Sequence, residues 1–257
     1  MLGGRVSLVI AETALELVPE ELTRHTSVQN HALRLEKKSN EIFLDRSFHH
    51  SAMKTGKIKM AWKRGRPDIA HFALLEALST PLYLEGMLDV FIHTIDDKVI
   101  TIGPNLRVPK SYFRFEGVMM KLFKDKIIKN QGSNKVLLKL NDSTTFESLI
   151  RKIIKSDNVI GLTSIGSQST PDQVVLKNSV EEKINCTFII GGFPKGHYSE
   201  YTSKFFNSSY SIAQYALESH VVIARILYEC EKILLYDKDY WQWLKDLLKM
   251  KGFRNEV

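Results

Sequence analysis

The chain is poor in cysteine and has no long apolar run. Its 257 residues include only two cysteines, Cys186 and Cys230, which lie far apart in the sequence. This spacing excludes a disulfide framework and a zinc site, and no other metal site is expected. Cys186 lies in an apolar run and is expected to be a buried small hydrophobe. No stretch approaches the roughly 18 apolar residues of a membrane span, so we expect a protein of the cytoplasm, or of the nucleus where there is one.

The sequence also lacks the usual fingerprints of nucleotide-binding enzymes. The glycine-rich stretch 191–196 follows a predicted strand, but its spacing fits neither a dinucleotide-binding turn nor a P-loop. Two adjacent glycines still allow a ligand to approach the backbone closely, and a plain turn is the alternative. The eight histidines form no catalytic set: His49 and His50 are expected to face solvent, and His71 to lie within reach of Asp68 on one helix.

Positive charge is concentrated in two segments. There are 36 Lys and Arg residues against 29 Asp and Glu residues, and segments 34–66 and 105–139 each carry a net charge of +7. The remainder therefore sums to −7. This distribution indicates a polyanionic partner, while solvated loops and helix faces are the alternative.

The order of apolar runs is that of an α/β protein. Residues 5–10 predict a first strand, and the spacing of Ala14, Leu15 and Leu17 predicts that a helix follows it. Pro67 precedes a helical stripe, so a helix is expected to begin there, beside Arg66 and Asp68. Further strands are predicted at 88–93, 99–102, 136–140, 159–162 and 187–190, an extended piece near 210–212, and helices at 113–129 and 217–234.

No linker or repeat divides the chain. Residues 1–235 are interpreted as one elaborated domain, and 236–257 as a helical tail that includes Tyr240, Trp241 and Trp243.

The local pattern around Asp68 leaves its role open. Asp68 on its own is equally consistent with an ordinary first-turn acid that complements the dipole of its helix.

Four stretches together form a more specific pattern. They are Arg-Gly-Arg-Pro-Asp and its continuation at 64–71, then 105–115, 189–196 and 211–217. In this order they resemble the small-subunit ribosomal RNA pseudouridine N1-methyltransferases of the SPOUT, or α/β-knot, class, over residues 5 to 235. The resemblance is to the compact archaeal members, which lack a long N-terminal extension. It implies an α/β fold with a mostly parallel sheet flanked by helices, a deep C-terminal trefoil knot and a homodimer.

The resemblance also implies that loops of the knot bind S-adenosylmethionine. Ala216 stands where the family commonly has proline. The matching positions are Thr163, Gly191, Gly196, Gln214, Tyr215, Ala216, Leu217, Glu218 and Ser219.

On the RNA side, Arg66, Arg107, Lys110 and Arg114 match substrate contacts, and Arg66 and Asp68 match the catalytic pair. Lys110 replaces an arginine and so lacks the bidentate fork. Arg66, fixed by Asp68, is implied to stabilise negative charge on the base, and Asp68 as a direct base is second choice. Lysines 37, 38, 54, 57 and 59 match no contact and are interpreted as solubilising.

The implied activity is methylation of N1 of a pseudouridine in 16S- or 18S-type ribosomal RNA, with a role in small-subunit biogenesis. The expected partners are that RNA and a second copy of the chain, ribosomal proteins or assembly factors are further candidates, and a eukaryotic member would be nucleolar. The alternative is a non-catalytic RNA-binding assembly factor that uses the same basic surface.

Overall fold

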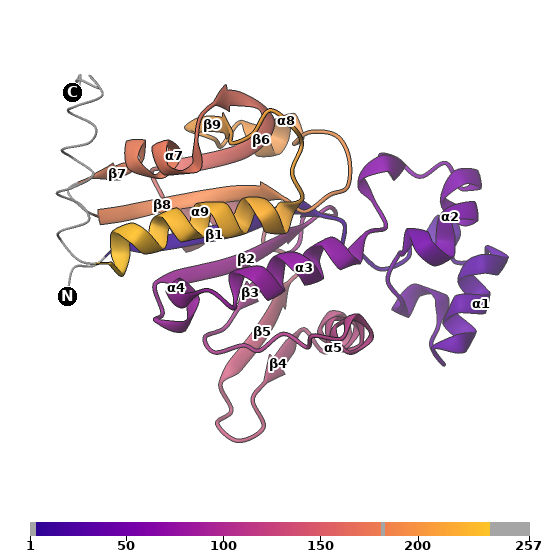
Figure 1. Cartoon of the computed structure of the whole chain (residues 1–257). Helices are drawn as coiled ribbons and strands as arrows, with labels where there is room; N and C mark the ends of the chain where they lie inside the picture. The colour runs from indigo at the N-terminus through magenta and orange to yellow at the C-terminus, as the bar shows by residue number, and fades with distance from the viewer. Residues whose placement is uncertain (1–3, 181–182, 237–257) are drawn as a thin grey trace.

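The computed structural model describes residues 4–180 and 183–236, in which the strands form a single sheet (Figure 1). The strands are β1 (Arg5–Thr13), β2 (Leu88–Thr94), β3 (Val99–Ile102), β4 (Ile127–Lys129), β5 (Val136–Asn141), β6 (Val159–Gln168), β7 (Ser179–Val180), β8 (Lys183–Gly191) and β9 (Ser208–Ser211). Their order is β4-β5-β3-β2-β1-β8-β6-β9, and β7 pairs with β8 alone.

The sheet has a parallel half and an antiparallel half. Strands β2, β1, β8, β6 and β9 pair in parallel, whereas β2-β3, β3-β5 and β5-β4 are antiparallel. The carboxyl ends of parallel strands meet at one edge of a sheet, and in open α/β sheets ligands bind at that edge. The parallel half therefore gives the molecule a natural binding edge.

Alternation along β1 supplies two hydrophobic layers. Leu8 and Ile10 point to one face and pack in the larger cluster, whereas Val9 and Ala11 point to the other and pack in a smaller one. This follows from the two-residue period of a strand. All four side chains are completely buried, as expected for a central strand covered on both faces.

Helices cover both faces. They are α1 (Thr26–Arg34), α2 (Arg46–Thr55), α3 (Pro67–Ala77), α4 (Pro81–Leu84), α5 (Tyr112–Asp125), α6 (Phe146–Ser148), α7 (Pro171–Lys177), α8 (Glu200–Ser203) and α9 (Ser219–Leu234). Figure 1 shows α3 and α9 side by side in front of the sheet, with α1 and α2 in a lobe at one end. A π-helical turn at Leu149–Ile154 packs under the opposite face.

Most of the predicted elements are confirmed. Pro67 is the first residue of α3, and the predicted hairpin is formed by β2 and β3. In the part of the chain described, no helix is long and apolar enough to cross a membrane. Cys186 is buried, and burial raises the pKa of its thiol to about 12.

The predicted helix after the first strand is wrong. Strand β1 continues to Thr13, and the backbone beyond it pairs with residues 42–44 instead of coiling: Leu17 bridges Phe43, and the Val18 amide donates to the Ile42 carbonyl at 2.9 Å. Pro19 then directly precedes a short 3₁₀ turn, Glu20–Leu22. The apolar residues that mimic a helical stripe are core residues of an irregular segment.

Several element boundaries differ from the prediction. The 113–129 helix ends at Asp125, because Lys126 adopts a left-handed conformation (φ 66°) and the chain turns into β4. Strand β6 continues to Gln168 across a bulge that lets Ser167 and Gln168 pair with β9. The long C-terminal helix begins at Ser219, two residues later than expected. The tail at 237–257 lies outside the described residues.

The expectation that His49 faces solvent is also wrong. His49 is fully buried, and its Nε2 atom lies 3.0 Å from Nδ1 of His31 across the α1–α2 contact. Burial lowers the pKa of His49 to about 4. His71 bonds not to Asp68 but to the carbonyl oxygen of Pro109, which lies 2.7 Å from its Nε2 atom.

Candidate functional site

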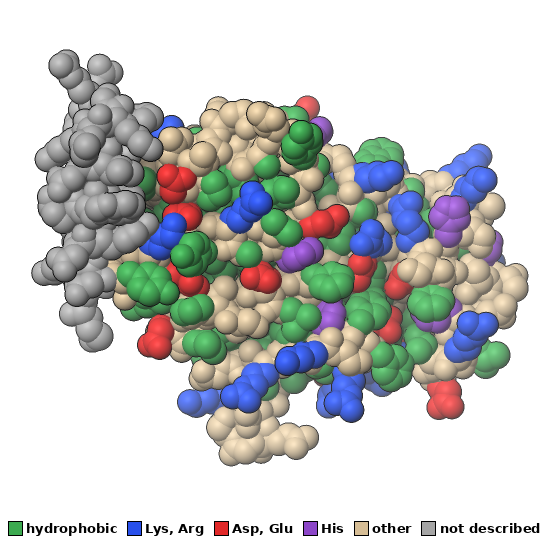
Figure 2. Space-filling view, viewed as in Figure 1, with side chains coloured by type: hydrophobic (Ala, Val, Ile, Leu, Met, Phe, Trp, Pro, Cys, Tyr) green, Lys and Arg blue, Asp and Glu red, His purple; other side chains and the backbone are tan. Residues whose placement is uncertain are grey.

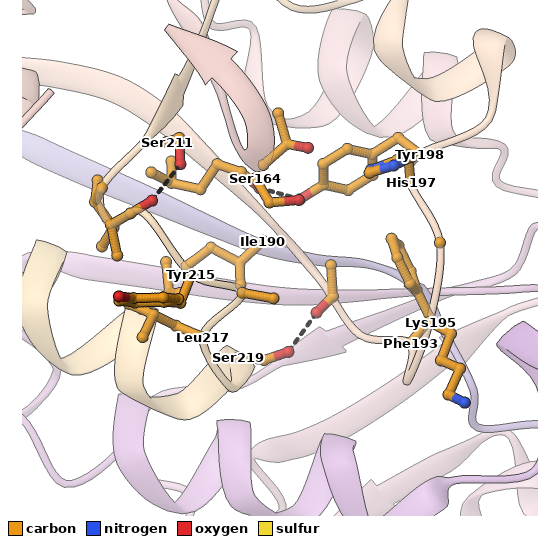
Figure 3. A pocket seen from close by; sticks show the side chains of 18 of the residues that line it. Ser164, Ile190, Phe193, Lys195, His197, Tyr198, Ser211, Tyr215, Leu217 and Ser219 are labelled. Atoms are coloured by element: carbon orange, nitrogen blue, oxygen red, sulfur yellow. Dashed lines mark hydrogen bonds between the residues drawn. The ribbon is translucent and has the colours of Figure 1, made fainter. Parts of the chain in front are cut away.

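A cavity of about 410 Å³ lies at the carboxyl edge of the parallel strands. Three segments border it: the continuation of β6 after Leu162, the loop 190–198 that follows β8, and the connection 210–219 from β9 into α9. Figure 3 shows Phe193 and Lys195 at one end of the cavity and Ser211 and Tyr215 at the other. Its size is that of a small-molecule site.

Backbone and apolar groups dominate the cavity wall. Leu162, Ile190, Ile212 and Leu217 supply aliphatic surface, and no aspartate or glutamate is among the described residues that line it. Such a lining suits a flat, largely uncharged ring system.

Side-chain hydrogen bonds hold the three segments together. The Ser219 hydroxyl donates to the Gly191 carbonyl at 2.5 Å and joins the start of α9 to the end of β8. The hydroxyl of the half-buried Tyr198 lies 3.0 Å from the carbonyl oxygens of both Leu162 and Ile189. The cavity is thus bordered by a fixed framework.

The glycine loop needs its glycines. Gly196 has a φ of +92°, which an L side chain rarely adopts. A Cβ on Gly192 would lie 2.8 Å from the Cα of Thr13, so only glycine allows the loop to pack this closely on β1.

Seven of the nine predicted cofactor residues line this cavity. Gln214 is exposed and, like Glu218, is not among the lining residues. Glu218 is the residue directly before α9 and instead lies near Arg66, whose pKa its charge helps to raise. The seven are Thr163, Gly191, Gly196, Tyr215, Ala216, Leu217 and Ser219.

Arg66 and Asp68 form the bidentate pair that the sequence predicts. Arg66 Nε lies 2.8 Å from Asp68 Oδ1, and Nη2 lies 2.7 Å from Oδ2. The hydrogen bond that Arg66 donates to Asp68 is the main cause of the raised pKa of Arg66. The two side chains are 40% and 31% exposed, so the fork is fixed while one side of the guanidinium stays accessible.

The N-termini of α2, α3 and α5 meet beside this pair. The Tyr112 hydroxyl, on α5, donates to Asp45 Oδ2 at 3.4 Å, and Asp45 caps α2. The His71–Pro109 hydrogen bond ties the segment before α5 to α3. Lys110 therefore follows directly on a residue that is fastened to the helix of Arg66.

Arg107, Lys110 and Arg114 are exposed, and the structure gives them no ion pair with any described acid. Arg107 and Lys110 also border a groove of about 520 Å³ against α3 and α4. Figure 2 shows Lys and Arg side chains in a row across the lower part of the view, below α3 and beside α5. Unpaired, exposed cations at one edge suit a polyanion.

A buried ion pair joins the two regions. Glu12, at the end of β1, accepts a hydrogen bond from the Ser199 amide at 2.7 Å and pairs with Lys63 Nζ at 2.5 Å. Burial opposes ionisation of Glu12, but the hydrogen bonds from Lys63 and Ser199 outweigh it and lower its pKa. Lys63 Nζ also lies 4.3 Å from the ring centroid of Phe193, a wall of the cavity. The chain segment that carries Arg66 is thereby anchored to the cofactor side.

Comparison with known proteins agrees with this geometry. The model of the EMG1/NEP1 methyltransferase family matches residues 8–231. The chain belongs to this family. It is 37% identical over 228 residues to the ribosomal RNA small subunit methyltransferase Nep1 of Staphylothermus marinus, a match that covers 89% of this chain and 96% of the relative. The Nep1 of Thermococcus sibiricus is 38% identical over 229 residues, covering 89% and 99%.

The family fold is also found among solved structures. The crystal structure of Archaeoglobus fulgidus Nep1 bound to S-adenosylhomocysteine matches with a TM-score of 0.75 at 29% identity, over 90% of this chain and 98% of that one. The fold class is therefore that of the family, and the SPOUT resemblance is confirmed at this level.

Several residues of this family member's site carry no clear signal in the sequence. Phe193 and Ile212 lie inside the stretches that carry the family resemblance, but nothing in the sequence identifies them as residues that line the cavity. Tyr198, Glu12 and Lys63 lie outside or at the edge of those stretches, and only the meeting of β1, β8 and the 61–63 turn reveals them. An alignment showing an invariant buried Glu–Lys pair is the kind of signal that finds such residues.

Proposed function

We propose that this chain is an S-adenosylmethionine-dependent methyltransferase that modifies N1 of a pseudouridine in small-subunit ribosomal RNA. The cavity carries the proposal, because seven matched positions meet there, at the edge where α/β sheets bind ligands. The basic face beside Arg66 and the names of the family relatives support the RNA substrate.

The cavity residues fit the cofactor. The aliphatic side chains of Leu162, Ile190 and Leu217 suit the adenine ring, and the backbone of the glycine loop can approach it closely. Lys195 is the cation placed to pair with the carboxylate of the amino-acid end. When bound, S-adenosylmethionine supplies an electrophilic methyl group.

Arg66 is assigned to the reacting base. N1 is the glycosidic nitrogen in uridine and becomes a free N–H only after isomerisation, so the substrate must already contain pseudouridine. Loss of the N1 proton to solvent water leaves negative charge on the ring, and a guanidinium held by Asp68 stabilises that charge without reorganising. Both Asp68 oxygens already accept from Arg66, which makes Asp68 the second choice as a base.

The target base must leave its stack to reach the methyl group. Unstacking costs a few kcal/mol and costs less in a loop than in a duplex. Arg107, Lys110 and Arg114 are assigned to RNA phosphates, which fixes the strand while the base rotates out.

The decisive experiment uses labelled S-adenosylmethionine and two short RNA hairpins that differ only in uridine or pseudouridine. Label should enter the pseudouridine hairpin alone, and equal labelling of both would overturn the N1 assignment. If the chain binds RNA but calorimetry detects no S-adenosylmethionine binding, the non-catalytic assembly factor is the better description.

Assembly as a homodimer, the trefoil knot and action in the cytoplasm, or in the nucleolus of a eukaryote, belong to the same proposal. Large apolar side chains are exposed on α3, α4 and α9, helices that pack together (Phe72, Leu84 and Tyr228). Figure 2 shows hydrophobic side chains over these helices. Sedimentation equilibrium of the full chain should give twice the monomer mass, and a monomer would refute the dimer.

A further inference from the structure

An exposed tryptophan, Trp62, lies beside the cofactor cavity. Trp62 is 55% exposed, although large aromatic side chains are usually well buried. A Cβ on Gly196, which lines the cavity, would lie 3.3 Å from Trp62 Nε1. Trp62 is not among the lining residues, so its ring lies beside the cavity and outside its wall. Arg66 follows four residues later.

The turn that carries Trp62 is held on both sides. The Ala61 carbonyl accepts a hydrogen bond from the Arg46 guanidinium. Lys63 pairs with the buried Glu12, and Arg64 makes a two-pronged contact with Glu16. The neighbours of Trp62 are therefore fixed by ion pairs and hydrogen bonds, while its own ring faces solvent. A rigid, exposed aromatic ring loses little entropy when a ligand stacks on it.

We propose that Trp62 is a stacking platform for an unpaired base of the RNA, at or next to the nucleotide that enters the site. Proteins that recognise single-stranded RNA stack bases on aromatic rings and hold the phosphates with cations. Here the accessible Arg66 guanidinium follows Trp62 by four residues in the chain, and the Trp62 ring lies against Gly196 of the cavity wall. This inference rests on the RNA substrate of the proposed function.

Tryptophan fluorescence tests the contact directly. The other two tryptophans, Trp241 and Trp243, are in the tail, so the full-length Trp241→Phe/Trp243→Phe variant keeps Trp62 as its one fluorophore. Addition of a pseudouridine hairpin should quench this emission strongly. Trp62→Ala should weaken hairpin binding about 5- to 50-fold and leave S-adenosylmethionine affinity unchanged.

Three control variants sharpen the result. Trp62→Phe should keep most of the affinity, whereas Trp62→Leu, which keeps apolar area without a ring, should not. Tyr201→Ala removes another exposed aromatic, on α8, and should bind the hairpin as the parent does.

Three outcomes decide the inference. Unchanged fluorescence with unchanged hairpin affinity of Trp62→Ala would overturn it, even if methyl transfer occurs. An equal loss of S-adenosylmethionine affinity would also overturn it, because Trp62 would then close the cofactor cavity. Quenching by the hairpin without any methyl transfer by the parent chain would support the stacking platform and sink the enzymatic function.

Discussion

The cofactor cavity and the face around Arg66 are formed by different kinds of chemical group. The cavity is bordered by aliphatic side chains, glycines and hydroxyls, and no aspartate or glutamate is among its described lining residues. The Arg66 face consists of charges, some paired and fixed, as in Arg66–Asp68, and some exposed and unpaired, as in Arg107. Shape and backbone therefore define one site, and charge defines the other. Substitutions on one side should leave the function of the other side intact.

The largest expected effect separates catalysis from cofactor binding. Arg66→Ala and Asp68→Ala should each lower the rate of methyl transfer about 100-fold, because removal of one fixed donor costs about that much. Calorimetry should show S-adenosylmethionine affinity within twofold of the parent chain. Asp68→Asn, which keeps the shape but loses the charge, should fall between Asp68→Ala and the parent chain. If Arg66→Ala lost affinity for S-adenosylmethionine, Arg66 would belong to the cofactor cavity and its assignment to the RNA base would be wrong.

The reciprocal change is Gly191→Ala. The added Cβ would lie 2.9 Å from the Phe193 ring, a wall of the cavity, so the ring must move. S-adenosylmethionine affinity should fall about 10-fold, while hairpin binding by filter assay stays unchanged. Gly117→Ala, in α5, is the control: nothing lies within 4 Å of the new Cβ, and alanine in a helix should stabilise the fold slightly. If Gly191→Ala lost as much affinity for the hairpin as for S-adenosylmethionine, the cofactor cavity and the Arg66 face would not be functionally separate.

Single substitutions of the unpaired cations should have smaller effects. Arg107→Ala, Lys110→Ala and Arg114→Ala should each weaken hairpin binding about three- to tenfold and reduce the slope of log affinity against log salt by roughly 0.7 to 0.9. Lys54→Ala, an exposed lysine of α2 outside the matched positions, is the control and should change the slope little. A slope that responds equally to all four would mean that the whole basic surface acts diffusely.

The smallest effect on activity is expected at a buried acid on the Arg66 face, where the change affects the stability of the fold. Burial, aided by Asp45, raises the pKa of Glu116 from 4.5 to about 7, and its Oε1 atom has no hydrogen-bond partner. Because the folded chain holds this proton more tightly than the unfolded chain, stability should fall as pH rises from about 4.5 to 7. Glu116→Gln cannot ionise, so its free energy of unfolding should rise by roughly 2 kcal/mol relative to that of the parent chain as the pH goes from 5 to 8. Thermal denaturation at both values measures this, and a constant difference would contradict it.

The sequence predicted the regular elements where the local pattern was unambiguous. Pro67 marks the start of α3, and the apolar runs mark β1, β2 and β8. It failed where apolar residues pair across the chain, as Leu17 does with Phe43, because a buried irregular segment and a helical stripe look alike in periodicity. The proposed cofactor residues came from the family resemblance, since a cavity of aliphatic side chains and glycines leaves no charge pattern to detect in the sequence.

By itself, the sequence determined the α/β class, the two basic segments and the adjacency of Arg66 to Asp68, because all of these are local properties of the chain. The tertiary structure decided that Glu12 pairs with Lys63, that Glu218 lies near Arg66 rather than in the cavity wall, and that Trp62 lies against Gly196. Such contacts join residues 51 to 187 positions apart, as from Glu12 to Lys63 and to Ser199. They depend on the order in which β1, β8 and β6 lie side by side, and no local periodicity encodes that order.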